Sequence, residues 1–199
     1  MSVSLFLAGL LALAAAVFLP ASSFHPVTPA MLTAAGARSG SRVPETVLEG
    51  SDGRMSSIAE IAADRLAVLI FIKDGCPCSE LAEPYFHRLH AIYGAHVAFV
   101  GVIDGDAAVA RSWAGRHQSA SPFPVLADPG QNVIRACGAE RSAYVALVAP
   151  SGAIDRLWPG YSAEMLAELG SQLAARTGVP ESPIDDKDAP KALSSGCPF

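Results

Sequence analysis

The chain has 199 residues, of which 51% are hydrophobic and 17% are charged, so it is a globular protein rather than a disordered one. Its net charge of −5 comes without a basic stripe that would neutralise phosphates, and we therefore expect no nucleic acid partner. The four cysteines are too few and too unevenly spaced for a disulfide scaffold, and they lack the paired C-x-x-C spacing of a structural zinc site. The length fits one ordinary domain with appendages.

The chain begins with an uncharged apolar segment, Val3 to Leu19, followed by Pro20-Ala21-Ser22-Ser23. This pattern is typical of a secretory signal peptide or a membrane anchor, and we assign residues 1–23 to one of these two. Either assignment places the domain outside the cytoplasm, in the periplasm or anchored to a membrane and facing it. Residues 24–42 are mainly Ala, Ser, Thr, Pro and Gly, which is the composition of a linker.

Folding signals begin with a short strand over residues 43–50 and a turn over residues 50–53, which a short helix over residues 57–63 follows. Residues 66–72 (LAVLIFI) are apolar without a break, and this run predicts a strand buried on both faces. Apolar side chains then recur at helical spacing as far as Gly94. These side chains are Leu81, Tyr85, Phe86, Leu89, Ile92 and Tyr93.

A second buried strand is predicted over residues 97–103, and Asp106 is the expected N-cap of the helix that follows. A short strand (123–126), a short helix (131–137), a hairpin (144–149 and 153–158) and a last helix from Ser162 to Gly178 complete the order. The alternation of strands and helices predicts parallel pairing, and the closing hairpin adds antiparallel strands. We assign residues 43–178 to the folded domain and residues 179–199, rich in Pro, Asp and Ser, to a flexible C-terminal tail.

The stretch between the central strand and its helix, Lys73 to Glu80, carries the chemistry. Pro77 suits the first helical position, which makes Cys76 the expected N-cap residue at the carboxyl end of a strand. The first amides of the helix and its dipole then favour the Cys76 thiolate, which is the nucleophilic form. We take Cys76 as the reactive thiol, flanked by Lys73, which would lower its pKa, and by Asp74, which would raise it.

Three residues are candidate partners of Cys76. Ser79 shares its helical face and is placed to donate a hydrogen bond to the thiolate, whereas Cys78 projects roughly 200° away, so that a Cys76–Cys78 disulfide requires the first turn to open. Cys197 lies in the predicted tail, which is long enough to reach Cys76 within the chain or between chains. Cys137 closes a short helix and is expected in the core.

No metal or other cofactor is expected. His87 and His90 share a helical face with Glu83, and we interpret this face as solvated rather than as a metal site. Two soft thiolates, Cys76 and Cys78, suit Cu(I), so a Cu(I)-binding protein remains the alternative from a different functional class.

The order of elements, with a Cys-Pro-x-Ser turn opening the first long helix, resembles the thioredoxin-like superfamily. The likeness is greatest to its redoxin branch, the extracytoplasmic thioredoxins and the alkyl hydroperoxide reductase/thiol-specific antioxidant proteins, and it covers roughly Val43 to Arg176. The resemblance implies an α/β fold, a three-layer α/β/α sandwich with a mixed central sheet. Pro84 corresponds to the family's helix-kinking proline, Cys76 to its nucleophilic cysteine, and Ser79 to its resolving cysteine.

The sequence departs from the family pattern at three places. Ser79 replaces the resolving cysteine while Cys78 is extra, and no proline stands near Ser142-Ala143, where the family has a cis-proline. Lys73 occupies the position of the threonine of peroxide-reducing members, which argues against a peroxidase. The resemblance thus implies an extracytoplasmic thiol–disulfide oxidoreductase that acts on protein thiols or disulfides, with Cys76, Cys78 and Ser79 in its site. A redoxin-fold protein without redox activity is a further alternative.

Overall fold

The structure is a computed structural model, and it describes residues 25–116 and 120–199. The predicted signal peptide or anchor, residues 1–23, lies outside the described residues. Within the described ranges no helix combines the length and the apolar character needed to cross a membrane.

The centre of the fold is a sheet of five strands in the order β6-β5-β4-β7-β8. The strands β4 (Leu66–Ile72), β5 (Val97–Ile103) and β6 (Val125–Ala127) are mutually parallel. The hairpin of β7 (Val145–Val148) and β8 (Ile154–Trp158) adds two antiparallel strands beside β4. The sequence predicted this mixture because the parallel strands alternate with helices and the last two strands are separated only by a tight turn.

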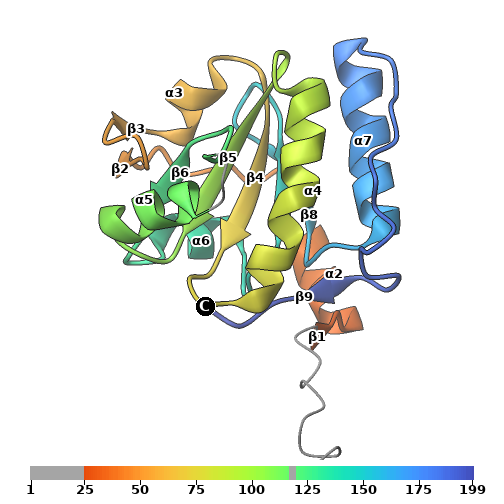
Figure 1. Cartoon of the computed structure of the whole chain (residues 1–199), viewed down its shortest axis with the longest axis horizontal. Coiled ribbons are helices and arrows are strands. Elements are labelled where there is room, and N and C mark those ends of the chain that lie inside the picture. Colours follow the sequence, from red (N-terminus) through yellow and green to blue (C-terminus); the bar gives the residue numbers. More distant parts are fainter. Residues whose placement is uncertain (1–24, 117–119) are drawn as a thin grey trace, which may run out of the picture.

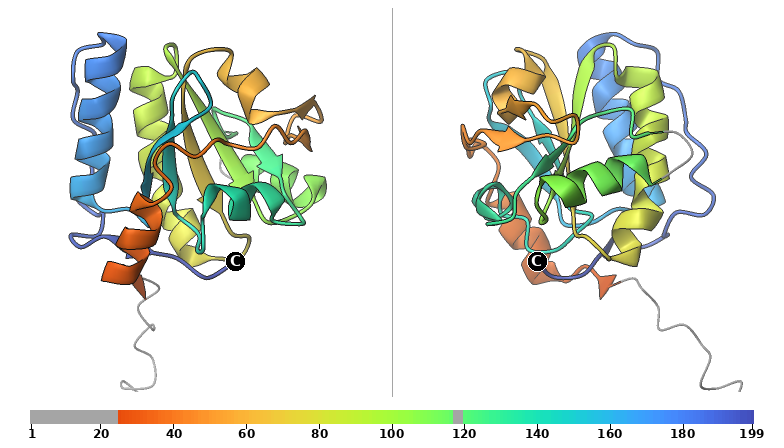
Figure 2. Two further views of the ribbon diagram at one scale, coloured as in Figure 1. Left: turned by 180° about the vertical axis from the view of Figure 1, so that it is seen from behind. Right: turned by 60° about the vertical axis from the view of Figure 1, so that its left-hand side comes forward.

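Helices cover both faces of the sheet (Figure 1). On one face lie α4 (Pro77–Tyr93), α5 (Ala107–Gly115) and α7 (Ala163–Thr177). The view from behind in Figure 2 brings forward α2 (Pro29–Gly36) and α6 (Asn132–Cys137), which share the other face with α3 (Ile58–Ala62). Successive residues of β4 enter the two cores alternately, which explains why its whole sequence is apolar. The fold is therefore the three-layer α/β/α sandwich with a mixed central sheet that the resemblance implied.

The helix that carries the site, α4, buries one face and contains Pro84. Tyr85, Phe86, Leu89 and Tyr93 pack into the core as predicted, whereas Leu81 is 50% exposed. A proline inside a helix has no N–H to donate to the carbonyl four residues earlier. In α4 this is the carbonyl of Glu80, which lies about one turn after Cys76.

The segment expected to be a linker contains structure of its own. It includes β1 (His25–Pro26) and the helix α2, whose N-cap Thr28 accepts a hydrogen bond from the amide of Met31. The helix forms despite its linker-like composition because its alanines favour helix and Ala35 packs into the second core. The expected strand over residues 43–50 is reduced to β2 (Leu48–Glu49), which pairs with β3 (Met55–Ser56).

The segment expected to be a flexible tail is packed along the molecule. Ile184, Ala189 and Leu193 contact the core that α4 and α7 share, and β9 (Ser194–Ser195) pairs with β1. The amides and carbonyls of Ser194 and Tyr161 also exchange two hydrogen bonds of 3.0 Å. The apolar residues are too widely separated to show helical or strand periodicity, which is why the sequence pattern missed this packing. The C-terminal segment passes beneath the start of α4, and the C terminus lies beside the loop that joins β4 to α4 (Figure 1).

One buried carboxylate fixes the connection from β6 to α6. Asp128 is 1% exposed and accepts three backbone hydrogen bonds of 2.9 Å, from the amides of Asn132, Val133 and Ile134. These amides are the unpaired donors at the start of the helix. Replacing Asp128 with alanine leaves them buried without a partner.

We predict that Asp128→Ala lowers the free energy of unfolding by about 3 kcal/mol, because hydrogen bonds to a charged group are lost and their donors stay buried. Urea denaturation measures the change, with the exposed Asp188→Ala as the matched control. A loss below about 1 kcal/mol would show that this carboxylate does not hold α6.

Candidate functional site

Cys76 stands at the carboxyl end of β4 and is the N-cap residue of α4, as the sequence predicted. Its backbone is extended (φ −93°, ψ 116°), and Pro77 occupies the first helical position. Gly75 precedes it with φ +68°, a conformation that glycine adopts without strain, and this lets the chain turn from strand into helix. The residue is only 1% exposed.

The Cys76 sulfur is surrounded by hydrogen-bond donors from distant parts of the chain. The hydroxyl of Ser142 and the backbone N–H of Cys197 each donate to Sγ over 3.2 Å. The side chain of Cys197 and the backbone N–H of Ser79, which donates to the Cys76 carbonyl over 3.0 Å, also lower the pKa of Cys76. The sulfur therefore lies where negative charge is compensated on several sides.

These contacts decide the ionisation of Cys76. Burial by itself raises the pKa of a thiol, but the hydrogen bonds from Ser142, Cys197 and Ser79 outweigh it and lower the pKa of Cys76 from 9.0 to about 7. Near neutral pH a large fraction of Cys76 is therefore thiolate, the form that attacks disulfides.

Cys78 is fully buried and stays a thiol. Burial raises its pKa to about 12, and the charge of Cys76 and a hydrogen bond to that residue act in the same direction. The two side chains therefore meet, although residues two apart on a helix project away from each other. The reason is that Cys76 is the N-cap and has an extended backbone, so the helical projection angle does not apply to it.

Ser79 takes part through its backbone. Its N–H lowers the pKa of Cys76, while its hydroxyl oxygen accepts a hydrogen bond of 3.2 Å from the amide of Lys73. The side chain is 4% exposed. The hydroxyl thus links the start of α4 to the end of β4.

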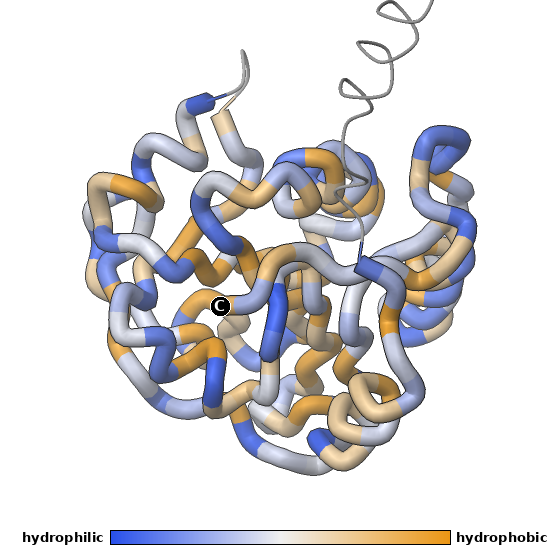
Figure 3. Tube along the Cα trace, turned by 90° about the horizontal axis from the view of Figure 1, so that it is seen from below, coloured by the Kyte–Doolittle hydropathy of each residue, from blue (hydrophilic) through white to orange (hydrophobic). Residues whose placement is uncertain are grey.

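Cys197 lies against Cys76 because the C-terminal segment crosses the site. Seen from below, this segment ends near the middle of the face of the molecule in view (Figure 3). The hydrogen bond to Cys76 raises the pKa of Cys197, as do burial and the charge of Cys76, whereas Lys73 and Arg141 lower it. Four free cysteines are present in the described chain, and three of them (Cys76, Cys78 and Cys197) gather here.

The loop before β7 supplies the donor that the sequence pattern did not identify. Ser142 is fully buried and is followed by Ala143, whose φ of +59° is unusual for a residue other than glycine. No cis peptide bond occurs among the described residues, and the Ala143 amide donates to the carbonyl of Phe71 over 2.8 Å. In the sequence, the only signal at Ser142-Ala143 was the absence of the proline that the family has there.

Charged side chains pair with one another around the loop between β4 and α4. Asp104, at the end of β5, accepts hydrogen bonds from Lys73 Nζ (3.0 Å) and from the amide of Asp74 (2.9 Å). Arg116 pairs with Glu80 at 2.8 Å and lies 3.5 Å from Asp74. Lys73 and Asp74 thus interact with other charged side chains. The hydrogen bonds to the Cys76 sulfur come instead from Ser142 and Cys197.

The other polar candidates lie away from the sulfurs. Glu83 is buried rather than solvated; it accepts a hydrogen bond from Trp113 Nε1 (3.0 Å) and lies 3.5 Å from His87 Nε2. Cys137 is a core residue, and burial raises its pKa to about 12. Within the described residues no group of three or more His, Cys, Asp or Glu side chains is arranged to hold a metal ion.

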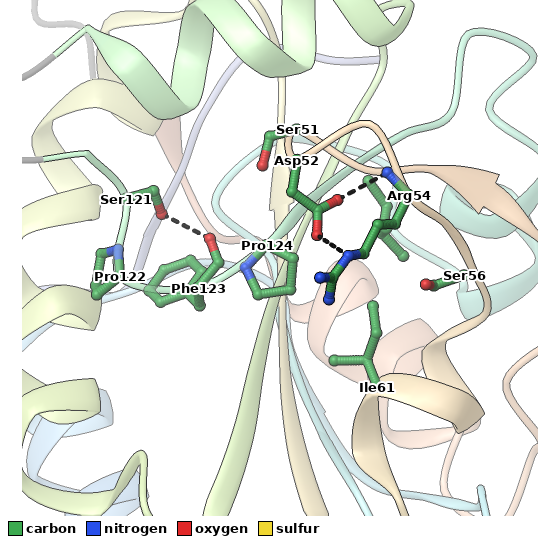
Figure 4. Close-up of a pocket in the computed structure, with 10 residues that line it drawn as sticks. Ser51, Asp52, Arg54, Ser56, Ile61, Ser121, Pro122, Phe123 and Pro124 are labelled. Atoms are coloured by element: carbon green, nitrogen blue, oxygen red, sulfur yellow. Dashed lines mark hydrogen bonds and ion pairs between the residues drawn. The ribbon is translucent and has the colours of Figure 1, made fainter.

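A separate cavity of about 430 Å³ lies beside the start of β6 (Figure 4). Its walls include Asp52 and Arg54, which form an ion pair, and Ser121, whose hydroxyl donates to the carbonyl of Phe123. Because its charged groups already pair with one another and no cysteine lines it, we assign it no part in the thiol chemistry.

Comparison with known families gives a direct assignment. The sequence profile of the AhpC/TSA family matches residues 39–157, more than half of the chain. The chain belongs to the AhpC/TSA family. No curated protein matches its sequence.

Solved structures share the fold of this family member at low sequence identity. A protein described as the thiol:disulfide interchange protein DsbE from Chlorobium tepidum has a TM-score of 0.62 and 20% identity, covering 70% of this chain and 98% of that one. The bacterioferritin comigratory protein of Xanthomonas campestris has a TM-score of 0.60 and 17% identity, covering 70% and 99%. DsbF from MTB has a TM-score of 0.56 and 23% identity, covering 75% and 98%. These similarities establish the thioredoxin-like fold.

We predict that Ser142→Ala raises the pKa of Cys76 from about 7 toward 9, because the thiolate loses a hydrogen bond while its burial remains. The rate of iodoacetamide alkylation, followed from pH 5 to 10, rises as the thiolate forms, so its midpoint should move to higher pH. Ser182→Ala, at an exposed serine, is the control. An unchanged midpoint would remove Ser142 from the site.

Proposed function

We propose that this protein is a thiol–disulfide oxidoreductase in which Cys76 is the attacking nucleophile. The observation that carries the proposal is the buried Cys76 sulfur, whose hydrogen-bond donors lower its pKa to about 7. A structural cysteine in a core has the opposite character, as Cys137 illustrates. The likeness in fold to a protein named as the thiol:disulfide interchange protein DsbE supports the same reaction.

The reaction proceeds by two exchanges. The Cys76 thiolate attacks one sulfur of a substrate disulfide, forms a mixed disulfide with it, and releases the other sulfur as a thiolate. A second thiolate then attacks the sulfur of Cys76 and releases the substrate. The substrate disulfide has gained two electrons, and Cys76 and the second cysteine are left as a disulfide. Run backwards, the same steps oxidise a dithiol substrate.

The contacts favour Cys197 over Cys78 as the second thiol. The charge of Cys76 and the hydrogen bond to it raise the pKa of Cys197, and both disappear once Cys76 is part of a mixed disulfide. Lys73 and Arg141 remain and continue to lower that pKa, so Cys197 becomes easier to deprotonate when its attack is needed. For Cys78 the largest cause of the raised pKa is burial, which persists.

Disulfide exchange is favoured over peroxide reduction. Lys73 stands where the resemblance to peroxide-reducing redoxins calls for a threonine, and its amide and ammonium groups are engaged by Ser79 and Asp104. A peroxide-consumption assay run beside the disulfide assay tests this choice.

The proposed location is extracytoplasmic. The uncharged run from Val3 to Leu19 is the support from the sequence. The substrates are then protein thiols or disulfides outside the cytoplasm.

We predict that Cys76→Ser abolishes insulin reduction, because the attacking sulfur is lost. Cys197→Ser should instead retain the first attack and accumulate mixed disulfides, visible as slower bands on non-reducing gels. Cys78→Ser should resolve its mixed disulfides like the wild type. If Cys78→Ser accumulates the adducts and Cys197→Ser does not, Cys78 is the second thiol.

We predict that residues 1–42, fused to an alkaline phosphatase that is active only after export, give an active reporter, because an uncharged apolar run drives export. Replacing Leu11 and Leu13 with arginine should abolish that activity by interrupting the run. Equal activity of the two fusions, or none from the native segment, would contradict the proposed location.

A further inference from the structure

The C-terminal segment, residues 194–199, lies on the site as an added antiparallel strand. The Ser142 amide donates to the Cys197 carbonyl and the Gly196 amide to the Ser142 carbonyl, each over 3.0 Å. Arg141 Nη1 donates to the Gly196 carbonyl over 3.1 Å, and the Phe199 amide donates to the carbonyl of Glu140. The contacts of this strand with residues 140–142 are therefore largely contacts of backbone with backbone, which an extended chain of different sequence can also make.

The position of Gly196 is the exception, because the strand has room there for a hydrogen only. A Cβ atom placed on Gly196 would lie 2.0 Å from Ser142 Oγ, 3.0 Å from Cys76 Sγ and 3.0 Å from Cys78 Cβ. These atoms are the buried thiol and its main donor, so they cannot move without disturbing the site. The backbone of Gly196 does not have the positive φ that favours glycine, and space alone demands glycine at this position.

The next residue of the segment presents a sulfur to Cys76. Cys197 donates its backbone N–H to Cys76 Sγ over 3.2 Å, and its thiol hydrogen-bonds to the same sulfur. A chain docked in this register thus brings a cysteine, preceded by a glycine, to the nucleophile. This is the arrangement that a substrate needs just before or just after disulfide exchange.

We propose that Ser142 and the residues around Cys76 bind an extended protein segment that carries glycine immediately before a cysteine, and that residues 194–199 occupy this site as a tethered ligand. The inference rests on the proposed function. It adds the class of substrate that reacts with Cys76 and the step, departure of the tail, that lets this substrate reach Cys76. Since the tail already uses both the N–H and the C=O of Ser142, an external segment binds only after the tail has left. The tail returns with Cys197 when the mixed disulfide is to be resolved.

The test uses the full-length protein and the variant Gly196→Ala, which expels the segment from the site through the contacts of its new methyl group. Gly36→Ala is the matched control, because a Cβ at Gly36 meets no atom within 4 Å. The alkylation rates of Cys76 are compared at high pH, where Cys76 is fully ionised in every variant. This choice is needed because loss of the Cys197 donors also raises the pKa of Cys76. Iodoacetamide should alkylate Cys76 about tenfold faster in Gly196→Ala than in the wild type or in Gly36→Ala.

The second measurement determines which peptides the opened site accepts. Peptides of sequence Ser-Ser-Gly-Cys-Pro-Phe and Ser-Ser-Val-Cys-Pro-Phe, each activated as the mixed disulfide with thionitrobenzoate, react with Cys76 of Gly196→Ala and release a coloured thiolate. The glycine peptide should react at least about tenfold faster, since overpacking at one rigid position costs a factor of this size or more. A redox-inactive peptide, Ser-Ser-Gly-Ser-Pro-Phe, should shift the Ser142 amide resonance of this variant, and its valine counterpart should not.

Two results would overturn the inference. Equal alkylation rates in the wild type and Gly196→Ala would show that the segment does not cover Cys76, and equal rates for the glycine and valine peptides would show that the site does not select glycine. Hydroxyethyl disulfide, which needs no peptide groove, separates these failures from a failure of the proposed function. If Cys76 of the opened variant Gly196→Ala does not react with this small disulfide, the oxidoreductase assignment is the part that is wrong.

Discussion

The ionisation of one buried sulfur is the constraint on which the site depends. Burial opposes a charge on Cys76, so the thiolate exists near neutral pH only because donors reach it from several directions. These donors come from the start of α4, from the loop before β7 and from the C-terminal segment. The sheet sets the distance between the first two, since β4 and β7 are adjacent and antiparallel. The third depends on the packing of residues 184–195 along α4 and α7.

The C-terminal segment links the stability of the fold with the chemistry of the site. β9 is held on one side by β1 and on the other by Tyr161, so the position of Gly196 and Cys197 is fixed by contacts that lie outside the site. β1 itself comes at the very start of the described chain, directly after the segment that we assign to export or anchoring. β1 and β9 thus bring the two ends of the described chain together, although they are separated by much of the sequence.

The sequence predicted the fold and the N-cap position of Cys76 because both depend on local patterns. The unbroken apolar run of β4, the Cys-Pro step and the helical spacing in α4 are each visible within a few residues, and together they place Cys76 at the N-cap. The helix α2 escaped prediction because its composition is that of a linker. The packed tail escaped because its apolar contacts, such as Ala189 and Leu193, are few and far apart.

The partners of Cys76 were harder to predict, since they belong to tertiary structure. Ser142 was noticed only as a position without proline, and no pattern in the sequence brings Cys197 to within hydrogen-bond distance of Cys76. Cys78 was expected to project away from Cys76 on the assumption that both residues are helical, whereas the extended backbone of an N-cap turns Cys76 back toward its neighbour. The N-cap position was thus predicted correctly, but its effect on the direction of the side chain was not taken into account.

The most direct test of this account is the NMR signal of the Cys197 backbone amide in the reduced protein. If this N–H donates to the Cys76 thiolate, its exchange with solvent is slowed and its chemical shift titrates with a midpoint near pH 7, the pKa of Cys76. Both effects should disappear in Cys76→Ser. An amide that exchanges at the rate of an unstructured chain, with no titration near neutral pH, would show that the segment does not lie on Cys76 and would contradict the account of the site.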